Sequence, residues 1–408
     1  MKYKFLFIYI LFLTTNVFSW LTYPPYLHSW GIHRADSIKL KLFFPGLSFK
    51  NPFKLSAVRL IASDDKSTSK DDLYITVYGL DKGLKEIIFN TSMSTLKKYS
   101  DTVSDYRYFL DNPKGFTSDE NGRLFICNSN KILFLSNNTQ DLIPIEIYTN
   151  FKNPYDIDIV TNNILIISES NSLIFFNILN QQKIKTIKIK NPSAISVTRK
   201  TNYFNCYHIN RIYFISETNK INAMNFSGEI LKTILLTNTS LGFFDLGAYS
   251  RLYIPDKLNS KILILDKDLN YIANFGKRGK GNNEFLNPTS VTIHDRFGMV
   301  FISDKTGAQY YWLGTKITNI TFKTNITYYT FSFNLTQPAD IKIWLIDIFN
   351  KKKYIIKKIK LFNYFNLIRL NKEKIKLKRN NKYKFLIEAN PLYSGKNRFI
   401  DKVFIYLK

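Results

Sequence analysis

The chain contains few of the residues that usually form cross-links or catalytic sites. Its 408 residues include only two cysteines and four histidines. Two cysteines cannot build a disulfide framework, so we expect a packed core to hold the fold and Cys127 and Cys206 to be free thiols. His28 and His33 are close in sequence, but no cysteine or carboxylate spacing completes a metal site around them. We therefore predict no metal site, no cofactor and no catalytic residue.

Acidic residues are also scarce. The chain has 31 Asp and Glu against 58 Lys and Arg, which gives a net charge of +27. The excess is greatest in residues 316–408, which contain 21 basic and 5 acidic residues. Two interpretations remain open, namely contact with an anionic envelope surface and an ordinary solvated basic surface.

Long apolar runs are absent except near the N-terminus. Lys2 and Lys4 precede an apolar run over residues 5–13, and Val17-Phe18-Ser19 places small or aliphatic residues where a peptidase cleaves. This pattern predicts a signal peptide over 1–19 and a short lead-in over 20–36, with a retained anchor as the alternative. We therefore expect an exported protein, whether periplasmic, cell-surface or extracellular, with no transmembrane segment after signal cleavage.

An extended, apolar segment recurs every forty to fifty residues or so. The most regular copy spans 275–304 and contains a glycine-rich stretch, a proline and the run Val300-Phe301-Ile302-Ser303-Asp304. Weaker copies begin at Asn51-Pro52, Asn112-Pro113, Asn153-Pro154 and Asn191-Pro192, and at Gly242, which stands where a proline is expected. Such a period is typical of one small sheet per repeat, and small sheets must stack to bury both faces.

Each part of the repeat has a physical reason. The Asn-Pro step favours extended backbone at the start of a strand. Asn121-Gly122 supplies the positive φ that a tight strand reversal needs. Continuous apolar runs such as 164–167 fit strands that are covered on both faces. We predict an all-β fold in which 37–314 closes into a six-bladed β-propeller, with five or seven blades as alternatives.

The segment 275–304 resembles an NHL repeat, and 37–314 is similar to an NHL/YWTD-like six-bladed β-propeller. Segment 37–44 alternates like a strand, and we interpret it as the outer strand that closes the last blade. The resemblance implies a binding face or, as in some family members, lyase chemistry at the central channel. Some NHL propellers bind nucleic acid, but the predicted export argues against that partner.

The repeat stops after Gly314, and 315–408 is predicted to be a separate Ig-like β-sandwich. Alternating strands are expected at 328–333, 341–346, 354–356, 383–387 and 403–407. This stretch resembles the Ig-like domain of flagellar-hook-capping type and the C-terminal sorting domain of type IX secretion cargo. Asn350 stands where those domains have a glycine. The departure favours a binding or spacer domain over a sorting signal.

Acidic residues recur near the end of the second apolar run of the repeats. Glu169, Glu217, Asp256 and Asp304 are separated by 48, 39 and 48 residues. In a propeller, the loop into the inner strand and the loop after the second strand emerge on one face, so these side chains and Asn153 should surround one mouth. We predict these five residues as a ring of binding residues. The alternative is that each one caps the turn of its own repeat.

These features favour a non-catalytic binding or scaffold protein of the bacterial cell envelope. Its propeller face would engage a protein or glycan partner, and the C-terminal domain would attach it to the envelope or to another chain. The alternative is a metal-assisted, lactonase-like hydrolase or lyase with a site at the central channel. The sequence identifies neither the ligand nor the oligomeric state.

Overall fold

The computed structural model describes residues 22–23, 34–63, 75–92, 95–198, 209–294, 298–375, 377–378, 381–392 and 400–407. The expected signal peptide lies outside these ranges, as do His28, His33, Cys206 and His208. The chain divides into two compact units, Pro24–Leu313 and a second one made of Met1–Tyr23 with Gly314–Lys408.

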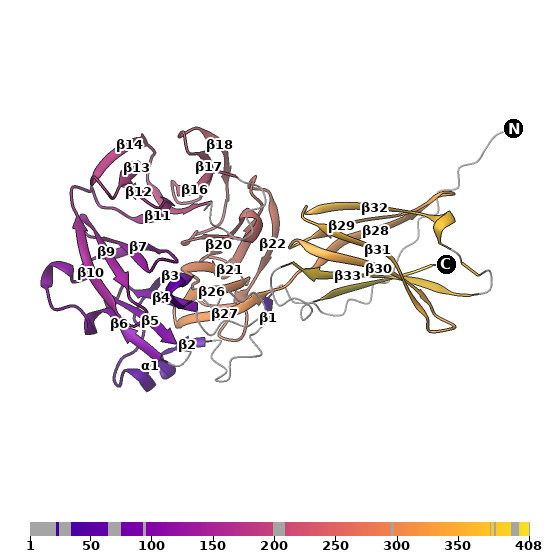
Figure 1. Ribbon diagram of the computed structural model, residues 1–408, viewed down its shortest axis with the longest axis horizontal. Helices are drawn as coiled ribbons and strands as arrows, with labels where there is room; N and C mark the ends of the chain where they lie inside the picture. Colours follow the sequence, from indigo (N-terminus) through magenta and orange to yellow (C-terminus); the bar gives the residue numbers. More distant parts are fainter. Residues whose placement is uncertain are drawn as a thin grey trace. The chain divides into compact units, whose positions relative to one another are not determined.

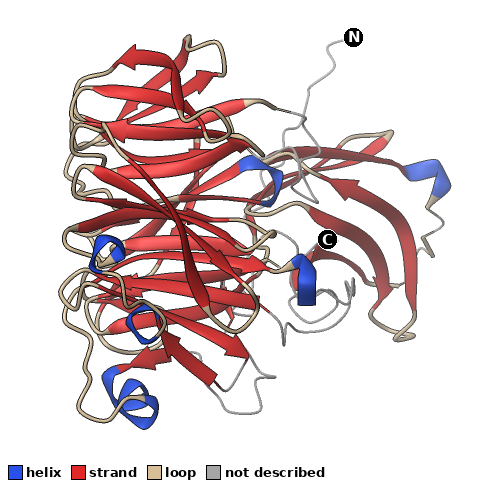
Figure 2. Ribbon diagram, turned by 60° about the vertical axis from the view of Figure 1, so that its left-hand side comes forward, coloured by secondary structure: helices blue, strands red, loops and turns tan. Residues whose placement is uncertain are grey.

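Strands make up most of both units (Figures 1 and 2). The strands up to Leu313 are β1 (Thr22–Tyr23), β2 (Arg34–Asp36), β3 (Pro52–Arg59), β4 (Ile75–Asp81), β5 (Glu86–Ser92), β6 (Thr95–Lys98), β7 (Pro113–Ser118), β8 (Arg123–Asn128), β9 (Lys131–Asn137), β10 (Leu142–Tyr148), β11 (Asp156–Thr161), β12 (Ile164–Glu169), β13 (Ser172–Asn177), β14 (Gln182–Lys188), β15 (Pro192–Val197), β16 (Arg211–Ser216), β17 (Lys220–Asn225), β18 (Ile230–Leu235), β19 (Asp245–Gly247), β20 (Arg251–Asp256), β21 (Lys261–Leu265), β22 (Tyr271–Phe275), β23 (Lys277–Arg278), β24 (Glu284–Phe285), β25 (Ser290–His294), β26 (Met299–Asp304) and β27 (Gly307–Leu313). The helices are α1 (Ser37–Phe43) and the short 3-10 helices η1 (Ile61–Ser63), η2 (Tyr99–Asp101), η3 (Tyr106–Tyr108), η4 (Ala248–Ser250) and η5 (Lys372–Lys374).

Four consecutive strands repeatedly form one antiparallel sheet in the unit Pro24–Leu313. The sheets are β3–β6, β7–β10, β11–β14, β15–β18 and β19–β22, and a further sheet joins β25–β27 with β2. Their apolar side chains pack between neighbouring sheets, as Tyr78 does with Phe116 and Phe175 with Phe214. This packing buries the continuous apolar runs on both faces.

The first strand of each sheet lies on the inside, and these inner strands close into a ring. Among the described residues, β3 contacts β7, followed in turn by β11, β15, β19 and β25, and β25 contacts β3 again. Backbone bonds join neighbouring inner strands, as where Gly115 N donates to Tyr155 O over 2.7 Å. Leu55 N donates to Ser290 Oγ over 3.1 Å where the last sheet meets the first. The unit is therefore a β-propeller-like assembly of repeated sheets.

The prediction that residues 37–44 form the closing strand was wrong. Residues 37–43 form helix α1, and β2 supplies the strand, with Arg34 opposite Gln309 on β27. The Asp36 carboxylate accepts a hydrogen bond from Lys39 N over 3.0 Å, which caps the helix. Only Leu40 of the helix is buried, so the alternation of apolar residues did not correspond to a sheet face.

Residues 314–408 form two sheets around one hydrophobic core. The strands are β28 (Ile317–Thr324), β29 (Tyr328–Leu335), β30 (Ala339–Asp347), β31 (Lys353–Leu361), β32 (Phe365–Asn371), β33 (Tyr383–Pro391) and β34 (Asp401–Tyr406). One sheet has the order β28-β29-β32 and the other β31-β30-β33-β34. Phe331 and Phe333 of the first sheet share the core with Ile343 and Phe385 of the second. Strands β28 and β32 were not among the predicted strands.

In the part of the chain that the structure describes, no helix has the length and apolar character needed to cross a membrane.

Candidate binding site at the mouth of the ring

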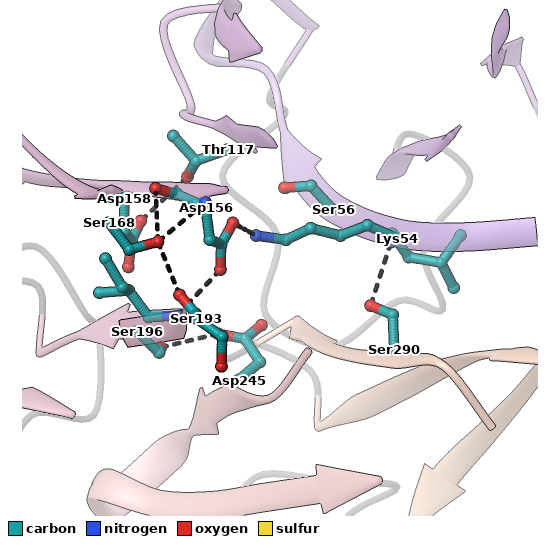
Figure 3. A network of polar contacts seen from close by, with 12 residues as sticks. Lys54, Ser56, Thr117, Asp156, Asp158, Ser168, Ser193, Ser196, Asp245 and Ser290 are labelled. Carbon is teal, nitrogen blue, oxygen red and sulfur yellow. Dashed lines mark hydrogen bonds and ion pairs between the residues drawn. The ribbon is translucent and has the colours of Figure 1, made fainter. Parts of the chain in front are cut away.

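Polar side chains occupy one equivalent position on every inner strand. When the sheets are aligned by how the first strand pairs with the second, the residues at this position are Ser56, Thr117, Asp158, Ser196, Asp245 and Thr292. The carboxylates among them accept bonds from the next sheet: Asp158 from Val197 N over 2.8 Å and Asp245 from Ile293 N over 2.9 Å. Thr117 Oγ1 also donates to Asp158 over 2.9 Å (Figure 3). The buried carboxylate of Asp158 and the half-buried one of Asp245 therefore tie neighbouring sheets together.

A buried ion pair lies two residues earlier on the inner strands. Lys54 Nζ of β3 donates to Asp156 Oδ1 of β11, and Ile195 N donates to Asp156 Oδ2 over 2.9 Å. Burial raises the pKa of Asp156 to about 6, and the Lys54 ammonium opposes that shift. Gly115 of β7 makes room for the pair, because a Cβ there would lie 2.0 Å from Asp156 Oδ1.

Three of the predicted ring carboxylates accept bonds from the loop that leads into their own sheet. Glu169 accepts from Lys152 N over 2.8 Å, and Asp256 accepts from Ser240 N over 3.2 Å. Asp304 accepts from Leu286 N over 3.0 Å and Asn287 N over 2.6 Å. Each of the three is buried at the end of its second strand.

Two residues that the sequence analysis missed hold equivalent loops. Asp81 accepts bonds from Lys50 N over 2.8 Å and Asn51 N over 2.9 Å. Asn128 accepts from the amides of residues 111 and 112, each over 3.0 Å. The sequence could have identified both residues, because each lies at the end of the second apolar run of its repeat.

The other two predicted ring residues make different contacts at the same ends of their sheets. Ser216, and not Glu217, occupies the strand-end position of Glu169 in the pairing register. Glu217 has a φ of 46° and pairs with Lys220 over 2.7 Å, which lowers the pKa of its carboxyl. Asn153, with a φ of 57°, accepts a hydrogen bond from Lys114 Nζ. The role of the five as ligand residues stays a prediction.

A small cavity of about 40 Å³ opens where the inner strands begin; we call it the mouth cavity. Its lining is Phe53, Tyr155, Ser193, Ala194, Leu241, Gly242, Phe243, Lys257 and Thr289. The ring centroid of Phe243 lies 5.0 Å from that of Phe53 and 5.5 Å from that of Tyr155. Burial raises the pKa of the Tyr155 hydroxyl to about 12.

Lysines surround this cavity. Lys257 lines it directly, and Lys82 Nζ lies 5.1 Å from the ring centroid of Phe53. Desolvation lowers the pKa of Lys257 and of Lys114. Lys82, Lys257 and Lys305 each follow a strand-end aspartate. The repeated Asp-Lys pair could therefore have identified these lysines in the sequence, but only its acidic member was predicted as a binding residue.

Over the described ranges, no three His, Cys, Asp or Glu side chains are grouped so that they could hold a metal ion. His294 is buried at the end of β25, and Cys127 is a buried free thiol.

No protein-family model and no curated protein matches the chain. Solved structures with some likeness include a streptogramin B lyase, at 15% identity and a TM-score of 0.43 over 67% of this chain and 96% of that one. Virginiamycin B lyase from Staphylococcus aureus shows 14% identity and a TM-score of 0.42, with coverages of 71% and 93%. BamB from Moraxella catarrhalis shows 12% identity and a TM-score of 0.35, with coverages of 58% and 69%. At these TM-scores the likeness carries no argument about function.

Proposed function

We propose that the chain is an exported, non-catalytic binding or scaffold protein. In this proposal, 37–314 is an NHL-type six-bladed propeller that engages a protein or glycan partner through the mouth of its ring. The region 315–408 is an Ig-like sandwich that attaches the protein to an anionic envelope surface or to another chain.

One observation carries the proposal. The carboxylates at the mouth bond to amides of the loops that lead into their own sheets, and those on the inner strands bond to amides of the next sheet, so they fix the loops and the ring. The same ends of the sheets present Phe53, Tyr155 and Lys257 around a cavity. Rigid loops that hold aromatic and cationic side chains in place are suited to binding, because little conformational entropy is lost when the partner docks.

The C-terminal unit supports an attachment role through strand β31. This edge strand includes Lys353, Lys357, Lys358 and Lys360 and has no acidic residue. Tyr354 and Ile355 on it are 49% and 43% exposed. A basic surface with exposed apolar residues favours anionic partners, and lysines on an edge strand also oppose unwanted strand pairing.

Site-specific photocrosslinking in the full-length protein tests the proposal. A photoreactive amino acid replaces Ser170 or Lys305, which are exposed at the mouth, or Gln182 or Lys188 on outer strand β14 as matched controls. We expect one identifiable partner to be crosslinked from the mouth positions only. Crosslinking of that partner from β14 alone would overturn the proposal.

The enzymatic alternative predicts a different result. It requires bound metal in the purified protein that is lost in Glu169→Ala or Asp304→Ala, which metal analysis of the two variants measures directly.

A further inference from the structure

We propose that the mouth cavity binds the carboxylate of an Asp or Glu side chain from an extended acidic segment of a partner protein. This inference rests on the proposed function, because it specifies the chemistry that the binding face recognises.

The size of the cavity limits what can enter it. A volume of about 40 Å³ holds a few heavy atoms, the size of a carboxylate with one methylene group. A sugar ring with its hydroxyl groups is larger than this volume, so part of it would remain outside the opening. A flexible acidic side chain has a small charged tip that fits, so the volume favours a polypeptide ligand over a glycan.

Among the residues that line the cavity, Lys257 alone is charged. No carboxylate of the described residues lies within ion-pair distance of the Lys257 ammonium, whereas Lys54 pairs with Asp156 and Lys220 with Glu217. Lys114, which is not one of the lining residues, donates to the neutral amide oxygen of Asn153.

Desolvation disfavours the charged form of both lysines, which is why the pKa of each is lowered. An incoming carboxylate would stabilise the ammonium form of Lys257 by direct attraction. The lining thus contains one cation, and none of its residues is acidic.

The aromatic lining suits the rest of an acidic side chain. Phe53 and Phe243 meet edge to face, with an angle of 73° between their ring planes, and Tyr155 stacks on Phe243 at 15°. The edges of aromatic rings carry partial positive charge and attract a carboxylate, while their faces pack against methylene groups. The same three rings can therefore contact both the charged tip and its apolar stem.

The lysines beyond the cavity extend the site to more than one acid. Lys82 lies against Phe53, and exposed Lys305 occupies the equivalent position after Asp304 in another sheet. An extended acidic segment could place further carboxylates near these lysines while one side chain enters the cavity. With a net charge of +27, the protein would attract such a segment from a distance.

The experiment is a titration of the full-length protein with a fluorescently labelled hexaglutamate peptide at low and at physiological salt. We expect Lys257→Gln to weaken binding tenfold or more, on the order of the loss of one desolvated charge contact. Lys114→Gln should weaken binding by a smaller factor, because Lys114 is desolvated but does not line the cavity. Lys188→Gln removes the same charge from exposed strand β14 and should change binding less than about twofold, as for a rim charge. Thermal melts of the three variants show whether each one is folded.

Equal weakening by all three variants would overturn the inference, because it would show only general electrostatic attraction. Competition by oligogalacturonate as strong as by unlabelled hexaglutamate would also overturn it in favour of an acidic glycan. If the mouth still crosslinks its partner while hexaglutamate does not bind, the carboxylate inference fails and the proposed function stands. If neither occurs, both fail.

Discussion

Lys54 on β3 and Asp156 on β11 form a buried ion pair, although 102 residues separate them and inner strand β7 lies between their strands. The lysine side chain reaches past β7 because Gly115 has no Cβ to block the contact. The pair links sheets that are not adjacent in the ring, so it stabilises the arrangement of three inner strands, β3, β7 and β11.

Lys54→Met should destabilise the protein at pH 7 by about 3 kcal/mol, because it leaves the Asp156 carboxylate buried without its cation. Equilibrium urea unfolding measures the change. The double variant Lys54→Met with Asp156→Asn should recover most of the loss, because no buried charge remains. A double variant as unstable as the single one would contradict this account.

The same pair makes the free energy of unfolding depend on pH, and the direction of that dependence follows from the pKa of Asp156. The pKa of Asp156 is about 6 in the folded protein, above its ordinary value of 3.8. Between pH 3.8 and pH 6 the folded protein therefore binds more protons at this carboxyl than the unfolded protein does. The contribution of this group to the free energy of unfolding therefore rises as the pH falls from 7 through 6 toward 4. The cost of Lys54→Met should accordingly be smaller at pH 5 than at pH 7, and Asp156→Asn should remove this part of the pH profile.

Gly115→Ala should destabilise the ring by about 3 kcal/mol or more, since the new Cβ would lie 2.0 Å from Asp156 Oδ1 and 2.6 Å from Asp156 Cα. Gly79→Ala is the matched control on β4, where the closest atom is a flexible methyl of Leu55 at 3.3 Å. We expect the control to cost less than about 1 kcal/mol. Thermal unfolding of both variants tests this, and similar losses would show that the close approach at Gly115 is unimportant.

Asp304→Ala should lower stability by about 2 kcal/mol, because two loop amides lose their charged acceptor. Glu217→Ala removes only a half-exposed pair with Lys220 and should change the melting temperature little. A differential scan of each variant measures this contrast. If Asp304→Ala leaves stability intact and abolishes binding, Asp304 is a ligand residue and not a loop cap.

Cys127 should not react with a thiol reagent at pH 8 in the folded protein. It is fully buried, and burial raises the pKa of its thiol. Labelling of a Cys206→Ser variant, counted by mass before and after adding denaturant, isolates this residue. Rapid labelling without denaturant would show that the sheet around Cys127 opens.

The second strands and their terminal residues could be identified from the sequence for a local reason. Pairing within each sheet joins segments that follow one another through short turns, so a strand, its turn and its terminal acid recur together in the repeat. Asp256 and Asp304 were identified in this way. At the end of β16, Glu217 was predicted instead of Ser216, because the polar residues Ser216 and Glu217 follow the apolar run together and the sequence does not show which of them ends the strand.

The residue types and their period determined that this protein is built from stacked small sheets and that acids recur at strand ends. Only the tertiary structure decided that Lys54 meets Asp156, that residues 37–43 form a helix, and that Lys257 lines a cavity together with Phe53, Tyr155 and Phe243. Those contacts arise when the inner strands close into a ring and bring distant sheets together. The local pattern of apolar and polar residues does not encode that closure, because it specifies which face of a strand is buried and not which sheet will cover it.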